Sequence, residues 1–296
     1  MIIHPGWIDC RSGCCIQLQV FGKKIADPVD CAGGDKKGLE LSSYYPGNAT
    51  LAEANSKTLY MYDVLASGKE SFKIEVPYKL IETGKKGVHK PLMVYLHGYN
   101  QNIKQFEEKI TDFFQLEAYH LLIQGPYPIY DTGGNRKVSE WGRAWYLYDG
   151  NRGQFIKSLE VSAEFIQQVL DRHLQLIKVS RICIFGYSMG GYLAGYFALT
   201  RWKHIHDLIV AGSRIKTEVL NDEWANISHM NVLALHGERD ESVKAEPQKD
   251  EIEKLQKHGV SATFKSIDEK HKLTEAFITE AKQWLTTLGY KEINKS

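Results

Sequence analysis

A serine flanked by glycines is the first feature of this sequence that indicates chemistry. Gly186-Tyr187-Ser188-Met189-Gly190 has the spacing G-x-S-x-G. It follows an apolar run at residues 181–185 and precedes a helical pattern at 190–199, the strand–turn–helix context in which this spacing presents a nucleophile. Side chains two residues before and after the serine would collide in so sharp a turn, so both positions require glycine. A serine that only caps a helix would explain a bare motif, but the flanking elements favour a nucleophile.

A serine nucleophile needs a base within hydrogen-bond reach and a carboxylate that orients this base. In strand–turn–helix hydrolases the chain order is serine, acid, histidine. Three carboxylates follow the apolar run 232–235, namely Glu238, Asp240 and Glu241. Asp240 is the expected acid, because a loop of this length can turn back toward the serine and a short side chain holds an imidazole tightly. Glu238 is the reserve, and a solvated acidic turn is the alternative.

The expected base is His271, one of eleven histidines. It follows the last expected strand, 262–267, and directly precedes the final helix, so it satisfies the chain order. His258 lies near a helix end and His229 precedes a strand, positions from which neither reaches the serine easily. Most isolated histidines are structural or surface residues, and position alone separates His271 from them.

Two backbone N–H groups must stabilise the oxyanion that forms when the serine attacks a carbonyl. One normally belongs to the residue after the nucleophile, which is Met189, and the other to a loop after an early strand. The run 92–96 is such a strand, and His97-Gly98-Tyr99 follows it. We therefore expect the Tyr99 N–H to be the second donor, against the alternative of an ordinary tight turn.

A long segment, residues 125–152, separates two of the expected strands and is rich in aromatic residues. Loops of this length inside compact domains are usually functional, and aromatic rings supply rigid apolar walls with polar edges. Some of these rings are equally well explained as core. The expected substrate-binding residues are Tyr127, Trp141, Trp145 and Tyr146.

The elements that position these residues alternate from residue 90 onward between short apolar strands and amphipathic helices. Such strands form a parallel sheet covered on both faces, and its ligands bind beyond the carboxyl ends of the strands. The expected site therefore lies after residues 96, 185, 235 and 267. We expect strands at 92–96, 121–123, 181–185, 208–210, 232–235 and 262–267, and helices at 103–116, 159–176, 190–199, 247–258 and 274–288.

The first 88 residues have a different character, and residues 1 to about 57 are rich in Gly, Lys, Asp and Ser. They are predicted to form an irregular or short-strand extension that ends in an edge hairpin, with arms at 59–65 and 71–81, ahead of a catalytic core at 89–296. Four of the five cysteines lie here, spaced C-x3-C-C-x15-C. This spacing disfavours a zinc site and leaves a local disulfide or free thiols open, whereas Cys183 lies in an apolar run and is expected in the core.

Bulk composition excludes several classes of partner. The formal net charge is +1, with acidic and basic residues well mixed, so no nucleic acid is expected to bind. No apolar run approaches the roughly 18 residues of a membrane span. Residues 1–20 lack the pattern of a signal peptide, which predicts a cytoplasmic protein. A chain of 296 residues buries a core without metal or disulfide support, and no cofactor or metal is expected.

Taken together, the motifs resemble the phospholipase/carboxylesterase family of α/β-hydrolases, which includes bacterial carboxylesterases and acyl-protein thioesterases. The resemblance covers roughly residues 88–288 and is specific in order and spacing. It implies an α/β-hydrolase fold, the triad Ser188, Asp240 and His271, and oxyanion donors at Tyr99 and Met189. The motif residues are Leu96-His97-Gly98-Tyr99, Gln124-Gly125-Pro126-Tyr127-Pro128, Gly186-Tyr187-Ser188-Met189-Gly190-Gly191, His236-Gly237-Glu238-Arg239-Asp240 and His271.

These expectations describe a serine carboxylesterase that hydrolyses small soluble esters through an acyl-enzyme. The gap between residues 213 and 231 is too short for a large lid domain, which favours short- to medium-acyl or aryl esters over emulsified lipids. A thioesterase or peptidase-like hydrolase on the same triad is the alternative. A catalytically silent binding protein is a third hypothesis, disfavoured by the intact triad. Oligomeric state and the role of residues 1–88 have no signature in the sequence.

Overall fold

The computed structural model describes residues 65–68, 70 and 72–293. The chain divides into two units, Met1–Glu70 and Ser71–Ser296, and the second carries all the described helices and strands. The predicted hairpin arm at 59–65, apart from its last residue, and the four N-terminal cysteines lie outside the described residues. Cys183 is a buried free thiol, as its apolar surroundings in the sequence predict.

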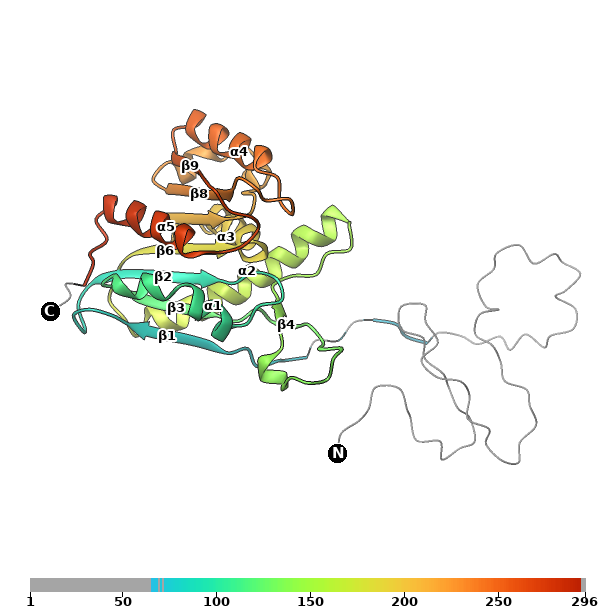
Figure 1. The fold of residues 1–296 in the computed structure, drawn as a ribbon. Coiled ribbons are helices and arrows are strands. Elements are labelled where there is room, and N and C mark those ends of the chain that lie inside the picture. Colours follow the sequence, from blue (N-terminus) through green and yellow to red (C-terminus); the bar gives the residue numbers. More distant parts are fainter. Residues whose placement is uncertain (1–64, 69, 71, 294–296) are drawn as a thin grey trace, which may run out of the picture. The chain divides into compact units, whose positions relative to one another are not determined.

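A seven-stranded sheet in the order β1-β3-β2-β6-β7-β8-β9 forms the centre of the folded unit (Figure 1). All neighbouring pairs are parallel except β1 and β3, which are antiparallel. The inner strands are apolar because both faces of the sheet are covered. Their bounds are β1 Tyr78–Glu82, β2 Lys90–Leu96, β3 Tyr119–Ile123, β6 Val179–Tyr187, β7 Asp207–Ala211, β8 Asn231–Gly237 and β9 Ser261–Ile267.

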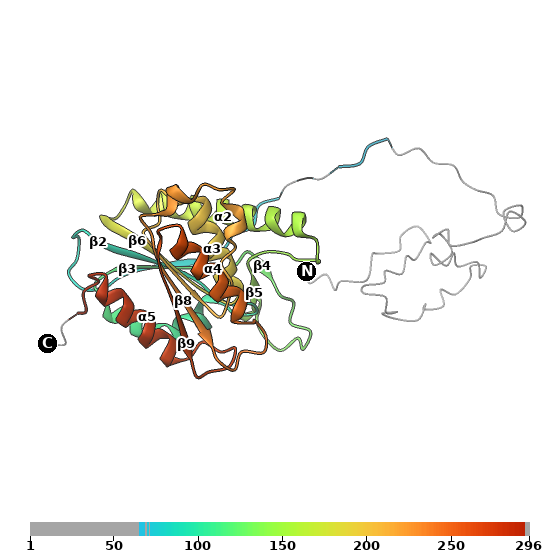
Figure 2. The same ribbon diagram turned by 90° about the horizontal axis from the view of Figure 1, so that it is seen from above.

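Helices cover both faces of the sheet, as Figure 2 shows from above. One hydrophobic cluster joins the sheet to α2 (Arg152–Leu174), α3 (Met189–Thr200) and α4 (Glu246–Lys257). A second cluster lies on the opposite face, against α1 (Ile103–Lys109) and α5 (Glu275–Thr287). This architecture confirms the predicted α/β-hydrolase fold, a mostly parallel sheet between two helical layers.

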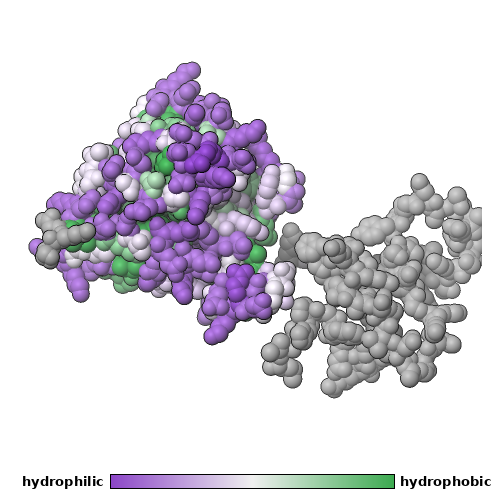
Figure 3. Space-filling model, in the orientation of Figure 1, coloured by the Kyte–Doolittle hydropathy of each residue, from purple (hydrophilic) through white to green (hydrophobic). Residues whose placement is uncertain are grey.

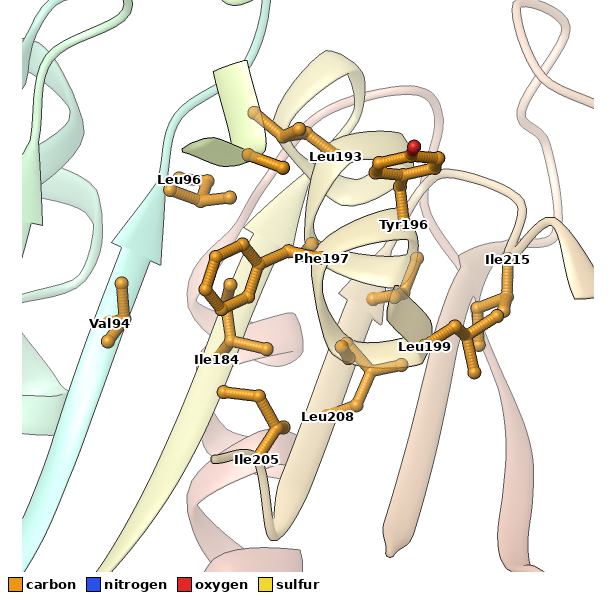
Figure 4. Close-up of a cluster of buried hydrophobic side chains, with 14 of the residues drawn as sticks. Val94, Leu96, Ile184, Leu193, Tyr196, Phe197, Leu199, Ile205, Leu208 and Ile215 are labelled. Carbon is orange, nitrogen blue, oxygen red and sulfur yellow. The ribbon is translucent and has the colours of Figure 1, made fainter. Parts of the chain in front are cut away.

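Helix α3 is the most deeply embedded helix and fixes the position of its first turn. Its residues from Leu193 to Leu199 are all buried. Phe197 lies over Ile184 of β6, and Leu193 approaches Leu96 at the end of β2 (Figure 4). Because burying a large apolar side chain contributes about 2 kcal/mol, this packing holds the start of α3 rigidly at the carboxyl edge of the sheet.

The helix expected at 103–116 is divided in two at Ile110. Asn102 begins α1 with a capping box, in which its side chain accepts from the Gln105 N–H. After Ile110 the chain tightens into a 3-10 helix, η3 (Thr111–Gln115). A three-residue repeat places Ile110, Phe113 and Leu116 on one side, and all three are buried. Core packing of these side chains therefore replaces a continuous α-helix.

Strand β1 joins the sheet at its edge, inside the segment assigned from sequence to the extension. It covers only Tyr78–Glu82, while residues 72–77 form no strand. Its described partner is β3, with Leu80 opposite Leu121. The sequence-based boundary near residue 88 thus falls after the first strand of the sheet. An alternating apolar pattern identified the strand, but not its partner.

The long segment between β3 and α2 contains a second, two-stranded sheet. Strand β4 (Tyr127–Pro128) pairs with β5 (Arg143–Ala144) in antiparallel fashion.

Hydrophilic residues cover most of the face of the folded unit drawn in Figure 3, where hydrophobic patches are small and separate. Of the helices in the described ranges, none is both long and apolar enough to cross a membrane.

Candidate active site

Ser188 stands at the turn between β6 and α3 with a backbone conformation that amino acids with side chains rarely adopt. Its φ is 51° and its ψ is −117°, a strained combination typical of functional turns. The Ser188 N–H donates to Ala211 O at 2.9 Å, which anchors the turn to β7. A Cβ at Gly186 would collide with Gly190 O, and one at Gly190 with Leu96 O. Close backbone contact therefore explains both flanking glycines of the motif.

A continuous hydrogen-bonded chain joins the three residues predicted to form the triad. The Ser188 hydroxyl lies 2.8 Å from His271 Nε2, and His271 Nδ1 lies 2.7 Å from Asp240 Oδ2. Ser188 follows β6, Asp240 follows β8 and His271 follows β9. The carboxyl ends of these parallel strands meet at one edge of the sheet, so residues 83 and 31 positions apart become neighbours.

Asp240 is held as a buried carboxylate. Its side chain is 1% exposed, and burial alone raises a carboxyl pKa. That effect is outweighed by hydrogen bonds from the Val243 N–H, His271 and the Ser242 N–H, so the pKa of Asp240 is lowered from its usual value. An ionised Asp240 only accepts hydrogen bonds, which requires His271 to carry its proton on Nδ1 and to offer the Nε2 lone pair to Ser188.

The competing carboxylates remain outside this arrangement. Glu238 and Glu241 are exposed, whereas the Asp240 side chain turns inward. Gly237 allows this turn, because a Cβ there would collide with Glu269 O in the loop before His271. The acid and base loops therefore pack directly on each other, and the short aspartate side chain spans the gap.

The two predicted oxyanion donors belong to different elements. Met189 is the first residue of α3, a position whose N–H has no acceptor within its own helix. Tyr99 lies in the loop after β2, and within the described ranges its N–H has no protein acceptor. Contact of Gly190 with the Leu96 and His97 carbonyls brings this loop against the first turn of α3. Both amides thus remain free to bind a ligand oxygen.

A buried imidazole and indole support the Tyr99 loop from beneath. His97 Nδ1–H donates to Gly98 O at 2.7 Å, and the Gly125 N–H donates to His97 Nε2 at 2.9 Å. Burial lowers the pKa of His97 to about 4, so the ring is neutral and its tautomer is fixed. The Trp145 indole donates to His97 O at 2.8 Å. These bonds hold the loop in the position that its amides need.

Tyr187 is a residue of the site that the motif analysis passed over. Its hydroxyl donates to His271 O at 3.1 Å, and its ring stacks on the imidazole with centroids 5.6 Å apart. Burial and the nearby Asp240 charge raise the pKa of Tyr187 to about 12, which keeps the donor protonated. Tyr187 is the first x of the G-x-S-x-G motif, a position that the motif does not specify, so the sequence alone did not predict this contact.

The four aromatic residues expected to bind substrate occupy different environments. Trp145 is 0% exposed, so it contacts the loop after β2 through His97 O and does not face solvent. Trp141 packs on the exposed Tyr130 ring at 5.1 Å, and Tyr127 pairs with Ala144 across β4 and β5. Tyr146 lines a cavity of about 480 Å³ whose other walls include Tyr148, Phe155 and Tyr192.

Comparison with known proteins places this geometry in a family. The sequence model of the phospholipase/carboxylesterase family matches residues 77–288. The chain belongs to this family. Lysophospholipase-like protein 1 of Mus musculus is 25% identical to this chain over 215 residues. The matched region covers 68% of this chain and 88% of the mouse protein. Membership of this family identifies the chain as a hydrolase.

Solved structures of low sequence identity share the fold of this phospholipase/carboxylesterase family member. Acyl-protein thioesterase 2 of Zea mays has a TM-score of 0.57 at 18% identity, covering 72% of this chain and 99% of the maize chain. A carboxylesterase of Bacillus cereus has a TM-score of 0.54 at 17% identity, covering 72% of this chain and 94% of the Bacillus chain.

Within the described residues, no group of three or more His, Cys, Asp or Glu side chains is arranged to hold a metal ion.

Proposed function

We propose that the protein is a serine carboxylesterase that hydrolyses small esters through an acyl-enzyme. The observation that carries this proposal is the hydrogen-bonded chain from the Ser188 hydroxyl through His271 to the buried Asp240 carboxylate. A hydroxyl in this setting transfers its proton to the imidazole as its oxygen attacks a carbonyl. Asp240 stabilises the imidazolium that results and keeps the ring oriented.

The first half-reaction ends with the acyl group on Ser188. Attack on the ester carbonyl produces a tetrahedral oxyanion, which the Met189 and Tyr99 N–H groups stabilise. The intermediate collapses, the bond to the alcohol oxygen breaks, and His271 Nε2–H protonates the leaving alcohol. A water molecule then transfers a proton to His271 as its oxygen attacks the acyl-enzyme carbonyl. The bond between the acyl group and Ser188 Oγ breaks, His271 returns the proton to Ser188, and the carboxylic acid leaves.

The proposed substrates are small because the described surroundings of the site contain no large cap. Between β7 and β8 the chain forms only two short 3-10 helices, η5 (Thr217–Val219) and η6 (Trp224–Ile227). The imidazole of His271 is 21% exposed, so substrates approach it directly from solvent. A binding cavity of about 480 Å³ fits a short- to medium-acyl or aryl group.

The test is the Ser188→Ala variant with 4-nitrophenyl acetate. We expect turnover to fall by several orders of magnitude, on the order of 10⁶-fold, and labelling by a fluorophosphonate probe to be lost at residue 188. Ser213→Ala is the matched control, since it removes a buried hydroxyl from the neighbouring loop without removing a triad residue. Retained turnover in Ser188→Ala would end the proposal. Matched acyl thioester and peptide substrates decide whether ester cleavage is the preferred reaction.

A further inference from the structure

The cavity beside α3 combines aromatic walls with two cationic side chains. Much of its lining is aromatic, and the charged residues of the lining are two cations and one carboxylate, Glu218, which is ion-paired with Arg214. The aromatic residues are Tyr146, Tyr148, Phe155 and Tyr192, and the cations are Arg152 and Lys216. A pocket for a neutral acyl chain needs only the apolar walls, because burying a cation costs free energy unless it is paired. Arg152 is exposed, so the cost of burial falls on Lys216, whose side chain is 19% exposed. Its place in this wall is not explained by the proposed esterase chemistry.

This cavity lies close to the proposed nucleophile through two connections. Tyr192 is one helical turn beyond Ser188, and its N–H donates to Ser188 O at 3.2 Å, a rise of about 6 Å along α3. The loop after β7 begins against the triad, since a Cβ at Gly212 would lie 3.4 Å from His271 Cε1. Four residues later this loop places Lys216 in the cavity wall. Ser188 and His271 do not line the cavity themselves, so only a substrate that extends from the triad into it can contact both places.

Lys216 is held between aromatic rings with little compensation for its charge. Its Nζ lies 5.3 Å from the Phe155 ring centroid and 5.9 Å from that of Tyr192. The side chain is 19% exposed, and its carboxylate neighbour, Glu218, is 3.7 Å away. Glu218 makes its shorter ion pair with Arg214, at 3.0 Å. Burial consequently lowers the pKa of Lys216, and an added anion would offset that cost.

Arg152 is the second cation of this cavity. It is the first residue of α2, where the positive end of the helix dipole disfavours a cation. Over the described ranges no carboxylate lies within ion-pair distance of its guanidinium. Arg152 also lines an adjoining cavity of about 460 Å³. A bound anion would relieve the dipole repulsion and supply the missing partner.

We propose that this cavity is an anion-binding subsite that selects esters carrying a carboxylate or similar negative group. Lys216 is its principal partner and Arg152 its second, while Tyr146, Phe155 and Tyr192 hold the arm between the anion and the ester carbonyl. The inference rests on the proposed serine esterase function and names its substrate class. Negatively charged esters then bind with a charge-assisted hydrogen bond that neutral esters lack.

Two pairs of substrates test this preference and locate the anion within the substrate. In the first pair the charge is on the acyl side, as mono-4-nitrophenyl adipate against methyl 4-nitrophenyl adipate. In the second it is on the alcohol side, as 4-acetoxyphenylacetate against its methyl ester. We expect kcat/KM to favour the anionic member of one pair by about 10- to 100-fold. The pair that shows the preference identifies the side of the ester that enters the cavity.

Three variants of the full chain assign the preference to the cavity. Lys216→Met should lower the anionic-to-neutral ratio about ten-fold or more, Lys216→Arg should retain most of it, and Arg152→Gln should lower it less than Lys216→Met. Lys203→Met is the matched control, because Lys203 lies 5.2 Å from the Trp202 ring centroid just beyond the opposite end of α3. Comparing both esters within one variant cancels any loss of folded protein.

The outcomes separate this inference from the function on which it rests. A preference that disappears in Lys216→Met, persists in Lys203→Met and weakens at high ionic strength supports the subsite. Equal kcat/KM within both pairs, or a preference that survives in Lys216→Met, overturns the subsite while the esterase function stands. Failure to hydrolyse either member of any pair overturns the esterase function itself.

Discussion

Two buried aspartates lie at opposite ends of the sheet and use their hydrogen bonds differently. Asp207 begins β7 and is 0% exposed. It accepts from Arg181 at 2.6 Å, Tyr290 at 2.7 Å and Asn231 at 2.9 Å. Asp240, beyond the carboxyl end of β8, accepts from two backbone N–H groups and from His271.

The two aspartates differ in whether their hydrogen-bond donors can exchange protons and in which residues those donors contact in turn. An arginine and an amide keep their protons throughout the accessible pH range, so the Asp207 cluster, with its tyrosine, ties β6, β7, β8 and the C-terminal segment together. The imidazole at Asp240 exchanges its proton and contacts Ser188 on its other side. Asp207 therefore stabilises the fold at one end of the sheet, and Asp240 at the other end has the contacts that the proposed reaction needs.

Among the changes that test this comparison of the two aspartates, Asp240→Asn should have the largest effect. An amide at this position favours the wrong tautomer of His271, so kcat should fall by about 10⁴-fold. Stability should change by less than about 2 kcal/mol, since the amide oxygen still accepts from the backbone. Ester hydrolysis and urea unfolding measure the two quantities. Near-normal kcat would remove Asp240 from the triad.

Asp207→Asn should lower stability and leave turnover unchanged, the reverse of the result expected from Asp240→Asn. This change leaves the partly buried Arg181 guanidinium without its carboxylate, so the free energy of unfolding should fall by about 3 kcal/mol. Turnover per folded molecule, counted by fluorophosphonate titration, should remain unchanged. A large loss of kcat without destabilisation would contradict the division between the two ends.

A buried histidine, His120, makes the stability of the fold depend on pH. Burial lowers the pKa of His120 to about 4, and its ring lies 2.8 Å from the Tyr95 hydroxyl and 2.8 Å from that of Thr83. An unfolded histidine binds a proton near pH 6.5, so the unfolded state takes up the proton first as the pH falls. The contribution of His120 to the free energy of unfolding is therefore fully present above about pH 6.5. It declines toward about pH 4, by up to roughly 3 kcal/mol.

Urea unfolding at pH 7 and pH 4.5 measures this decline. His120→Gln should reduce the difference in stability between the two pH values, because the titrating group is gone. His204→Gln, at an exposed position near the end of α3, is the control and should leave that difference as it is. Asp240, with its lowered pKa, contributes stability that is lost only at still lower pH. An unchanged difference in His120→Gln would show that another group carries the decline.

The smallest effect is expected from Tyr187→Phe. The substitution removes the hydrogen bond to His271 O and keeps the stacked ring, so stability should fall by about 1 kcal/mol. Positioning of the imidazole matters in the transition state, so kcat should fall by less than about ten-fold with KM nearly constant. Tyr78→Phe on the edge strand β1 is the control. A change confined to KM would place Tyr187 in substrate binding instead.

The sequence predicted the parts of the site that local sterics and chain order govern. Gly186 and Gly190 mark the turn because no Cβ fits there, and His271 follows from its place after the last strand. Trp145 shows where such reasoning ends, since an indole suits a pocket wall and a core equally well. Only its complete burial and its bond to His97 O separate the two.

Sequence by itself determined the strand–turn–helix motif and the α/β class and predicted the order of nucleophile, acid and base. Each depends on residues close together in the chain, on the order of the strands or on the period of apolar residues. Tertiary structure decided that β1 pairs with β3, that Tyr187 holds the imidazole loop and that Lys216 faces the aromatic cavity. These contacts join segments far apart in the chain. Strand pairing and packing create them, and no local pattern of residues encodes which distant surfaces meet.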